Sequence, residues 1–242
     1  MLYIPDMNLV TNYQQKVLKL LAGKIDDFYL AGGTALSAYY FNHRESVDLD
    51  FFTHKFHKPR VEKIAVLISL GTKKKIKLSG QELRKNMVKI AVYNLLIDNK
   101  GKILKIDFVE DYIKLLKPLK SVNGINVLSL EDIYLRKLFA ITGTSVAEDI
   151  TGRKIAKGGR QEAKDFYDLF CLSQIFMRLS DFAVKYGNPL IRESIIRWFR
   201  TYGRFDMKTG LLELSLKKNV DYNEIERHFT REVDKLIEQE VG

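Results

Sequence analysis

The sequence has 242 residues, 46% of them hydrophobic, which suffices for the apolar core of one large domain or two modest ones. No apolar run approaches the roughly 20 residues that cross a bilayer, Met1–Leu9 carries no signal-peptide pattern, and the single Cys171 excludes an intrachain disulfide. A net charge of +10 favours a polyanionic partner, and these features together predict a soluble cytoplasmic protein.

A glycine turn follows the first expected strand, at 27–31. Gly32 and Gly33 allow the chain to turn tightly and its backbone to approach a ligand closely. Thr34 is then placed to cap a helix at 34–42, and the free N–H groups of a helix N-terminus can bind an anion. Because such turns are common in α/β domains, this turn alone indicates structure more often than function.

Two aspartates alternate along the next expected strand, at 48–53. Asp48 and Asp50 would share one face of that strand, and Leu49 would point to the other. Carboxylates held this close repel each other unless a cation lies between them, and hard oxygen ligands favour Mg²⁺ or Mn²⁺. Asp-x-Asp pairs are also frequent in solvated loops, but here the apolar neighbours such as Phe51 hold the pair against a core. The turn and the aspartate pair together suggest nucleotidyl transfer.

A third carboxylate lies on an expected hairpin formed by the β-rich runs 87–97 and 102–109. Apolar residues at every second position of the later run leave Asp107 on the opposite face, together with Lys105. Two interpretations are about equally weighted: Asp107 is a third metal ligand, or it is a surface aspartate paired with a lysine across the strands. The motif upstream favours the metal ligand.

The second half of the chain is predicted to be helical, and two lysines and two aspartates in it are candidate site residues. Lys137 lies close to the apolar side of its helix, and the alternative to a functional role is snorkelling along the core edge. Lys164 and Asp168 are four residues apart and could form only a helix ion pair. Asp165 could merely complement the N-terminus of the same helix.

Glycines, threonines and lysines are frequent between Gly143 and Gly159, which indicates an insertion. It is either a lid or acceptor-binding loop or a tolerated surface insertion, and the second is the default. Basic residues also cluster, and aromatic neighbours suit unstacked RNA bases, although most basic patches are only solvated surface. The clusters are Lys73-Lys74-Lys75-Lys77, Lys114-Lys117-Lys120 and Arg192-Arg197-Arg200-Arg204.

These residues resemble the signature blocks of one enzyme family. Gly32–Leu36 followed by His43–Phe52 is similar to the glycine-plus-Asp-x-Asp signature of the AbiEii/AbiGii-type nucleotidyltransferase toxins, within the DNA polymerase β-like superfamily. Lys137, Arg160 and the run Lys164–Leu169 resemble that family's Lys and Lys-Asp-x-x-Asp motifs. The resemblance covers roughly two-thirds of the chain.

Two departures from the family pattern occur near the glycine turn. Fourteen residues separate Gly33 from Asp48, somewhat more than is usual, and Thr34 replaces the more common serine. A threonine hydroxyl can still contact phosphate, so the chemistry stays plausible.

The resemblance implies an α+β fold, with a polymerase β-like mixed-sheet nucleotidyltransferase domain at 1–127 and a helical domain at 128–242 that closes the active-site cleft. The pattern of residues agrees with this order of elements. Helices are expected at 11–23, 34–42, 59–70, 129–142, 161–176, 180–186, 190–202 and 222–239, and strands at 27–31, 48–53, 74–79, 87–97 and 102–109.

The resemblance also implies a Mg²⁺- or Mn²⁺-dependent enzyme that moves a nucleotide from an NTP to an acceptor hydroxyl, as a toxin with a cognate antitoxin. RNA, for example the tRNA 3′ end, is the leading acceptor, and a protein hydroxyl or a small antibiotic is the alternative. The rival class is a non-catalytic basic protein that binds RNA or a partner on the same fold.

Family resemblance assigns roles to individual residues as well. The metal ligands would be Asp48, Asp50 and Asp107. The nucleotide would contact Gly32, Gly33, Thr34, Arg44, Lys137, Arg160 and Lys164. Asp165 and Asp168 would shape the site or assist proton removal, and so join the metal ligands and Lys137 as catalytic residues.

Overall fold

The computed structural model describes residues 7–148, 152 and 154–241. It contains a mixed sheet and many helices, which confirms the expected α+β fold. The chain forms two compact units. Unit 1 comprises the chain up to Ala35 together with Ser46–Ser129, and unit 2 comprises Leu36–Glu45 and the chain from Leu130 onward.

Unit 1 is built on a seven-stranded sheet with the strand order β3-β4-β5-β2-β1-β7-β6. β2 runs parallel to β5 and β1 parallel to β7, while the other neighbours are antiparallel. The strands are β1 Tyr29–Ala31, β2 Asp48–Thr53, β3 Ile76–Glu82, β4 Ile90–Leu96, β5 Ile103–Glu110, β6 Lys120–Val122 and β7 Ile125–Val127. The hairpin β4–β5 and the bounds of β2 agree with the sequence analysis, which did not predict β6 and β7.

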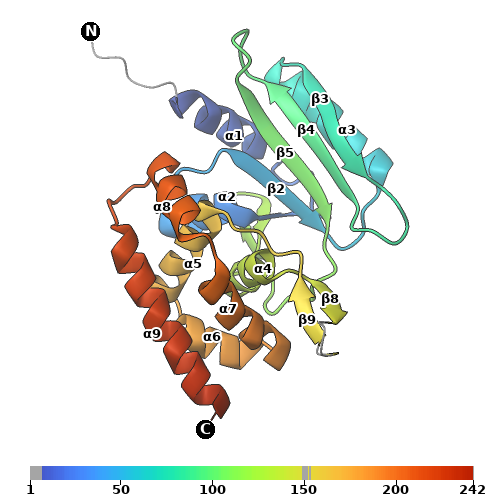
Figure 1. The fold of residues 1–242 in the computed structure, drawn as a ribbon. Helices are drawn as coiled ribbons and strands as arrows, with labels where there is room; N and C mark the ends of the chain where they lie inside the picture. Colours follow the sequence, from blue (N-terminus) through green and yellow to red (C-terminus); the bar gives the residue numbers. More distant parts are fainter. Residues whose placement is uncertain (1–6, 149–151, 153, 242) are drawn as a thin grey trace, which may run out of the picture. The chain divides into compact units, whose positions relative to one another are not determined.

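Helices α1 (Met7–Leu21) and α3 (Lys58–Thr72) pack along the sheet of unit 1 (Figure 1). Alternation decides which side chains face them, because successive residues of a strand point to opposite faces. In β2, Leu49 and Phe51 are fully buried, whereas their neighbours are only half-buried. One face of the sheet therefore belongs to the apolar core, and the other is left for polar side chains.

The turn after β1 differs in one respect from the prediction. Helix α2 (Gly32–Leu36) begins at Gly32, whose φ of +68° starts the turn two residues earlier than expected. Thr34 thus lies inside the first turn, and the prediction that it caps the helix is wrong. The helix continues as a π-helix, η1 (Ser37–Phe41), which ends at Asn42 in the left-handed conformation.

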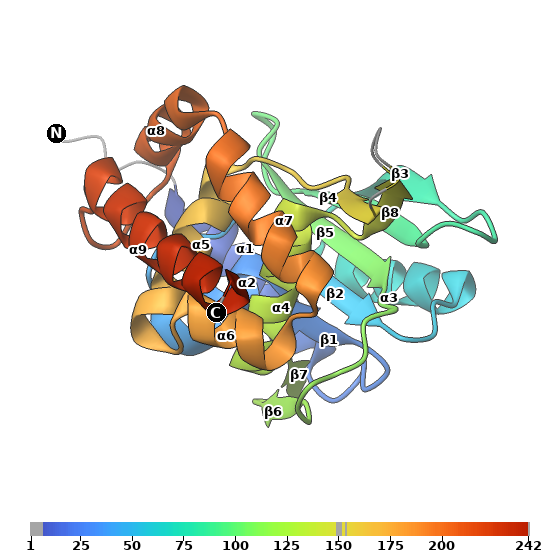
Figure 2. The ribbon, with the colours of Figure 1, turned by 60° about the horizontal axis from the view of Figure 1, so that its bottom comes forward.

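Unit 2 is mainly helical, and its core is aromatic. The Phe166 ring lies 5.0 Å from that of Phe229 and 5.3 Å from that of Tyr202, and all three side chains are buried. Helix α9 packs against α6 and α7 (Figure 2). The helices are α4 Leu130–Thr142, α5 Ala163–Ile175, α6 Leu179–Tyr186, α7 Pro189–Thr201, α8 Arg204–Glu213 and α9 Tyr222–Val241. Of these, α8 was not predicted.

The segment between α4 and α5 contains a hairpin of β8 (Ser145–Glu148) and β9 (Lys154–Lys157), although part of it lies outside the described residues. Glycines are needed at its base. A Cβ on Gly143 would lie 2.0 Å from the backbone oxygen of Lys157, and one on Gly159 would lie 2.0 Å from that of Ile141. The chain therefore crosses itself closely where the hairpin leaves the helices.

Within the described residues, none of the helices combines the length and the apolarity that crossing a bilayer requires.

A buried histidine makes the stability of unit 2 dependent on pH. His228 is 1% exposed and contacts Ser173 through Nε2 and Gln174 through Nδ1, and burial lowers its pKa to about 4 from an ordinary value of 6.5. The neighbouring Glu232 opposes this shift and Arg178 supports it. As pH falls below 6.5, the unfolded chain takes up a proton that the folded chain does not, so stability decreases.

We expect His228 to account for about 2 to 3 kcal/mol of the stability lost between pH 7 and pH 4.5. Urea unfolding at the two pH values measures this loss. His228→Gln keeps a neutral polar side chain and removes the titration, so its loss should be smaller than that of the wild type by this amount. Equal losses in the two proteins would contradict the assignment.

Candidate functional site

Three carboxylates come from two neighbouring strands of unit 1. The parallel register of β2 and β5 pairs Asp50 with Asp107 and Asp48 with Lys105. Residues paired in this way share one face of a sheet, so the expected common face of the three aspartates is confirmed. Asp107 is 7% exposed, which excludes the interpretation as a surface aspartate.

Gly32 leaves the space that the side chain of Asp50 occupies. A Cβ on Gly32 would lie only 2.1 Å from Oδ2 of Asp50, and the φ of +68° also disfavours any other residue. The glycine turn and the Asp-x-Asp strand are therefore one structural feature, in which the absence of a side chain at residue 32 leaves room for a carboxylate.

The Thr34 hydroxyl fixes the start of β2. It donates a hydrogen bond to the backbone oxygen of Asp48 and also contacts the Ser46 hydroxyl, 2.8 Å away. Gln14 of α1 donates to the same two residues, to the backbone oxygens of Ser46 at 2.9 Å and Asp48 at 3.1 Å. Thr34 is 4% exposed. Its observed contacts position Asp48, and a contact with phosphate stays a prediction.

A lysine lies beside the third carboxylate. Nζ of Lys105 is 2.5 Å from Oδ2 of Asp107, on the same strand, so the shared face predicted for this pair is confirmed. Across residues 7–148, 152 and 154–241, no group of three or more His, Cys, Asp or Glu side chains adopts a metal-binding arrangement. The carboxylate oxygens at this face are nevertheless the donor set that a hard divalent cation prefers.

We call Asp48, Asp50 and Asp107 together the acidic centre. Gly32→Ala is expected to disturb this centre as well as the backbone. The positive φ alone costs about 1 to 3 kcal/mol of stability, and the added methyl group would displace the Asp50 carboxylate. Gly101→Ala is a matched control, since Gly101 has φ +89° and no atom within 4 Å of the added Cβ. Both variants should lose similar stability in urea, but only Gly32→Ala should lose binding of Mn²⁺. Equal Mn²⁺ binding by the two variants would contradict the prediction that a methyl group at residue 32 displaces the Asp50 carboxylate.

The second cluster of candidate residues is a buried ion network in unit 2, centred on Asp168. Its carboxylate accepts hydrogen bonds from Nε and Nη2 of Arg44, at 2.6 and 2.8 Å, and from Nε2 of His43 at 2.7 Å. Nζ of Lys137 lies 2.6 Å from Oδ2. Asp168 is 0% exposed and Lys164 pairs with Glu162 instead, so the interpretation of Lys164 and Asp168 as only a helix ion pair is wrong.

Lys137 joins Asp168 to a second buried carboxylate. Its Nζ lies 2.6 Å from Oδ1 of Asp165, and Oδ2 of Asp165 accepts a hydrogen bond from Nε of Arg160, also at 2.6 Å. Lys137 is 6% exposed, so the snorkelling alternative is wrong, whereas the Arg160 side chain is 49% exposed. Two aspartates are thus shared among Lys137, Arg44 and Arg160, and Nε of Arg160 also lies 3.5 Å from Oε1 of Glu162.

The network holds both aspartates in the ionised form. Burial alone would raise their pKa values, but the charge of Lys137 and the hydrogen bonds from Arg44 and His43 hold the pKa of Asp168 well below its usual range. Lys137 and Arg160 likewise lower the pKa of Asp165. Burial would lower the pKa of Lys137, but the two carboxylates raise it. A carboxylate with a lowered pKa is a weak base.

The segment that brings Arg44 to Asp168 is fixed by backbone pairing within unit 2. The N–H of Glu45 donates to the Ser215 oxygen, and that of Lys217 donates to the His43 oxygen, both at 2.9 Å. His43 also stacks on Tyr167, with ring centroids 5.6 Å apart. His43 was not among the predicted site residues, although its position next to Arg44 in the resembling block was an available signal.

Lys164 is not brought into this network. Its Nζ lies 2.9 Å from Oε2 of Glu162, and both side chains are partly exposed. The structure thus assembles the predicted residues into an acidic group in unit 1 and a mostly buried network in unit 2, with Lys164 beside the second.

Comparison with known proteins identifies the family of this chain. Residues 19–241 match the model of the family described as nucleotidyl transferase AbiEii toxin, type IV toxin–antitoxin system. No curated protein shows significant similarity to the sequence.

Two solved structures from Helicobacter pylori share the fold. JHP933 is 18% identical, with a TM-score of 0.59 over 98% of this chain and 96% of that one. A second H. pylori structure, of a protein assigned to the nucleotidyltransferases, is 18% identical, with a TM-score of 0.60 over 98% of this chain and 99% of that one.

Proposed function

Because this chain belongs to the AbiEii nucleotidyltransferase toxin family of type IV toxin–antitoxin systems, we propose that it transfers a nucleotide from an NTP to a hydroxyl group of RNA in a Mg²⁺- or Mn²⁺-dependent reaction. The observation that carries the proposal is the register of β2 and β5, which sets Asp50 opposite Asp107 beside a glycine turn. An antitoxin would be the protein partner, and the tRNA 3′ end is the leading acceptor.

The three aspartates of the sheet would hold the divalent cation. Asp48, Asp50 and Asp107 share one face of unit 1, and the two strands that carry them are anchored by long hydrogen-bonded ladders. When bound, such a cation would polarise the α-phosphate and neutralise charge on the departing pyrophosphate. The rigid sheet would fix the carboxylates before substrate arrives, which is what positioning catalysis requires.

The glycine turn would receive the nucleotide. Gly32 and Gly33 present backbone without side chains at the start of α2, next to Asp50. A triphosphate bound there needs more positive charge than the metal supplies. We assign that role to four cations of unit 2: Arg160, Arg44 and Lys137 of the network, and Lys164, which lies outside it and pairs with Glu162.

Asp165 and Asp168 would act as positioning residues. Both are 0% exposed and bind the cations around them. With lowered pKa values they would fix Lys137, Arg44 and Arg160 and would be poor acceptors of the proton from the attacking hydroxyl.

The reaction can be tested with labelled NTPs. An acceptor oxygen forms a bond to the α-phosphorus, the bond from that phosphorus to pyrophosphate breaks, and the hydroxyl proton is lost. Label in the α-phosphate should therefore appear in RNA on a gel, with Mg²⁺ and without EDTA, whereas label in the γ-phosphate should not. Each of the four NTPs, incubated with total RNA or with cell protein, identifies the donor and the acceptor.

Transfer of α-label to protein would overturn the RNA acceptor, and transfer of γ-label would indicate phosphoryl transfer instead. No transfer to either fraction would support the rival class, a basic binding protein that retains the fold.

Nucleotide contacts of the exposed cations give a further test. Arg160→Ala and Lys164→Ala should each weaken NTP affinity roughly tenfold, because each removes a charged hydrogen-bond donor to phosphate. Lys208→Ala, an exposed lysine of α8 in the same unit, is the control. Equal affinities for all three variants would remove both residues from the nucleotide site.

A further inference from the structure

Lys105 brings a positive charge of the chain's own into the acidic centre. Its Nζ is 2.5 Å from Oδ2 of Asp107, and on β2 its register partner is Asp48. Burial would lower the pKa of Lys105, but the hydrogen bond to Asp107 and the charges of Asp48 and Asp50 raise it. The ammonium group is therefore attracted by all three carboxylates that are assigned to the metal.

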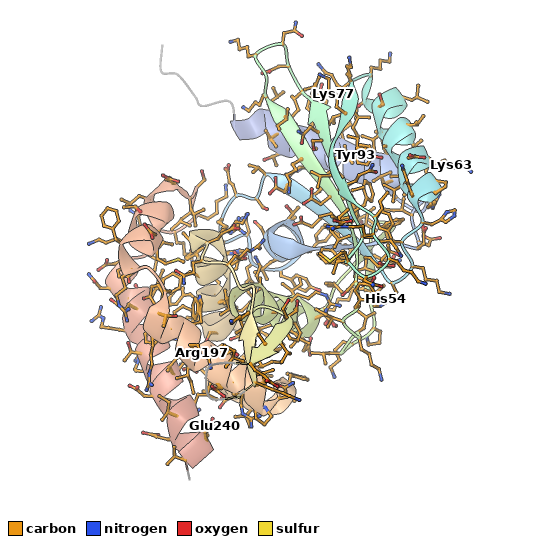
Figure 3. All side chains as sticks on the ribbon, turned by 45° about the vertical axis from the view of Figure 1, so that its right-hand side comes forward. His54, Lys63, Lys77, Tyr93, Arg197 and Glu240 are labelled. Atoms are coloured by element: carbon orange, nitrogen blue, oxygen red, sulfur yellow. The ribbon has the colours of Figure 1, made fainter. Side chains whose placement is uncertain are left out.

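The same lysine also begins a polar row that runs away from the acidic centre. Asn94 on β4 is the register partner of Lys105, and Lys77 on β3 is the register partner of Asn94. Residues directly opposite each other on neighbouring strands share a face and lie close enough for their side chains to interact. Lys77, labelled in Figure 3, is exposed. A long lysine side chain at residue 105 can thus turn toward Asp107 or toward this row.

The strand order separates the two substrates. The glycine turn follows β1, which lies on one side of β2, while β5, β4 and β3 lie on the other side. If the triphosphate binds at the turn, the acceptor is left to bind on the other side of β2, over β5, β4 and β3. A row with two lysines and an amide suits the phosphates of an RNA strand, because these side chains supply only cations and hydrogen-bonding groups.

This inference rests on the proposed function. We propose that Lys105 exchanges partners when the divalent cation binds. In the metal-free protein it binds Asp107, and in the metal-bound protein it binds a phosphate of the RNA acceptor, beside Asn94 and Lys77. Like charges repel, so an ammonium group and a divalent cation compete for the same carboxylate. Metal binding thereby completes the acceptor site. Lys105 is a positioning residue that couples the two ligands.

The first test measures binding of Mn²⁺ alone to the full chain. The electron paramagnetic resonance signal of the free ion reports how much Mn²⁺ stays unbound. Lys105→Met removes the competing charge and should bind Mn²⁺ roughly fivefold more tightly than the wild type, the upper range for a partly exposed pair. Lys105→Arg keeps the charge and should bind like the wild type. Lys89→Met is the control, because it removes a lysine 2.9 Å from Glu110 in the same unit.

The second test is the affinity for a fluorescently labelled single-stranded RNA, with and without saturating Mn²⁺. Without Mn²⁺, the wild type and Lys105→Met should bind equally, since Lys105 is engaged by Asp107. With Mn²⁺, the wild type should bind roughly threefold more tightly than Lys105→Met, and Lys105→Arg should retain most of that gain. The coupling must appear in both binding measurements, because linkage is reciprocal.

Specific outcomes would overturn this exchange. Unchanged Mn²⁺ affinity in Lys105→Met, an equal gain in Lys89→Met, or an RNA difference that is the same with and without Mn²⁺ would each do so. These outcomes differ from failure of the proposed function, which would show as Mn²⁺ binding that survives Asp48→Asn and Asp50→Asn, or as wild-type protein that does not bind RNA.

Discussion

Replacing Asp168 with alanine is expected to destabilise the protein by about 3 to 5 kcal/mol, because it leaves buried positive charges without their carboxylate. Arg44 would lose its bonds from Nε and Nη2, and Lys137 would keep only Asp165. Asp168→Asn should cost nearly as much, since an amide has the right size but no charge. Urea unfolding with a comparison of midpoints and slopes measures the loss.

Glu162→Gln is the matched control for this prediction. It removes the ion pairs of Glu162 with Lys164, at 2.9 Å, and with Arg160, at 3.5 Å. All three side chains are at least 38% exposed, and exposed pairs contribute about 0 to 1 kcal/mol each. A loss for Asp168→Ala as small as that of the control would show that the network is not held together by its charges. The loss should also shrink in acid, as pH falls toward the lowered pKa of Asp168 and the wild type itself loses the ionised group.

Asp50→Asn is expected to reduce nucleotidyl transfer by roughly a thousandfold while leaving the fold intact, because it removes one ligand charge from the proposed metal site. Asp50 is half-buried on the polar face of the sheet, so an amide of the same size should not disturb the apolar core. Asp107→Asn should have a similar effect. The measurement is the rate of label transfer from the NTP, with unfolding curves to show that each variant is folded.

Asp98→Asn serves as the control for these substitutions. Asp98 lies in the turn of the β4–β5 hairpin, where its side chain accepts from the backbone N–H groups of Lys100 and Lys102. The Asp98→Asn substitution removes a carboxylate from the β4–β5 hairpin and leaves the shared face of β2 and β5 unchanged. Activity of Asp50→Asn equal to that of Asp98→Asn would place the reaction elsewhere in the molecule.

The sequence predicted those features that depend on local alternation. The period of two placed Asp48 with Asp50 on one face of β2, and Asp107 with Lys105 on one face of β5. The structure confirms both placements, and the pairing of the two strands joins the faces. Gly32 was predicted to let the backbone approach a ligand closely, but the group that lies against it in the structure is the Asp50 side chain. Only the three-dimensional pairing of β1 with β2 brings those two residues together.

The contacts within the buried network could not be predicted from local sequence patterns. Arg44 and Asp168 are 124 positions apart, and Lys137 and Asp165 are 28 apart, so no helical or strand period connects them. Family resemblance identified the residues but not their mutual contacts. The hairpin between α4 and α5 was missed because its glycines read as a loop, whereas at Gly143 they permit a close crossing of two backbones.

The discontinuity of unit 2 has a consequence for synthesis on the ribosome. Arg44 leaves the exit tunnel long before Asp168, and at rates of about 5 to 20 residues per second the interval is on the order of ten seconds. The backbone partners of His43 and Glu45, at residues 215–217, are made later still. The network around Asp168 therefore cannot form on the nascent chain before that residue has emerged, and the backbone pairing of His43 and Glu45 has to wait for residues 215–217. A nascent chain that stops short of residue 215 would lack this pairing and should be inactive.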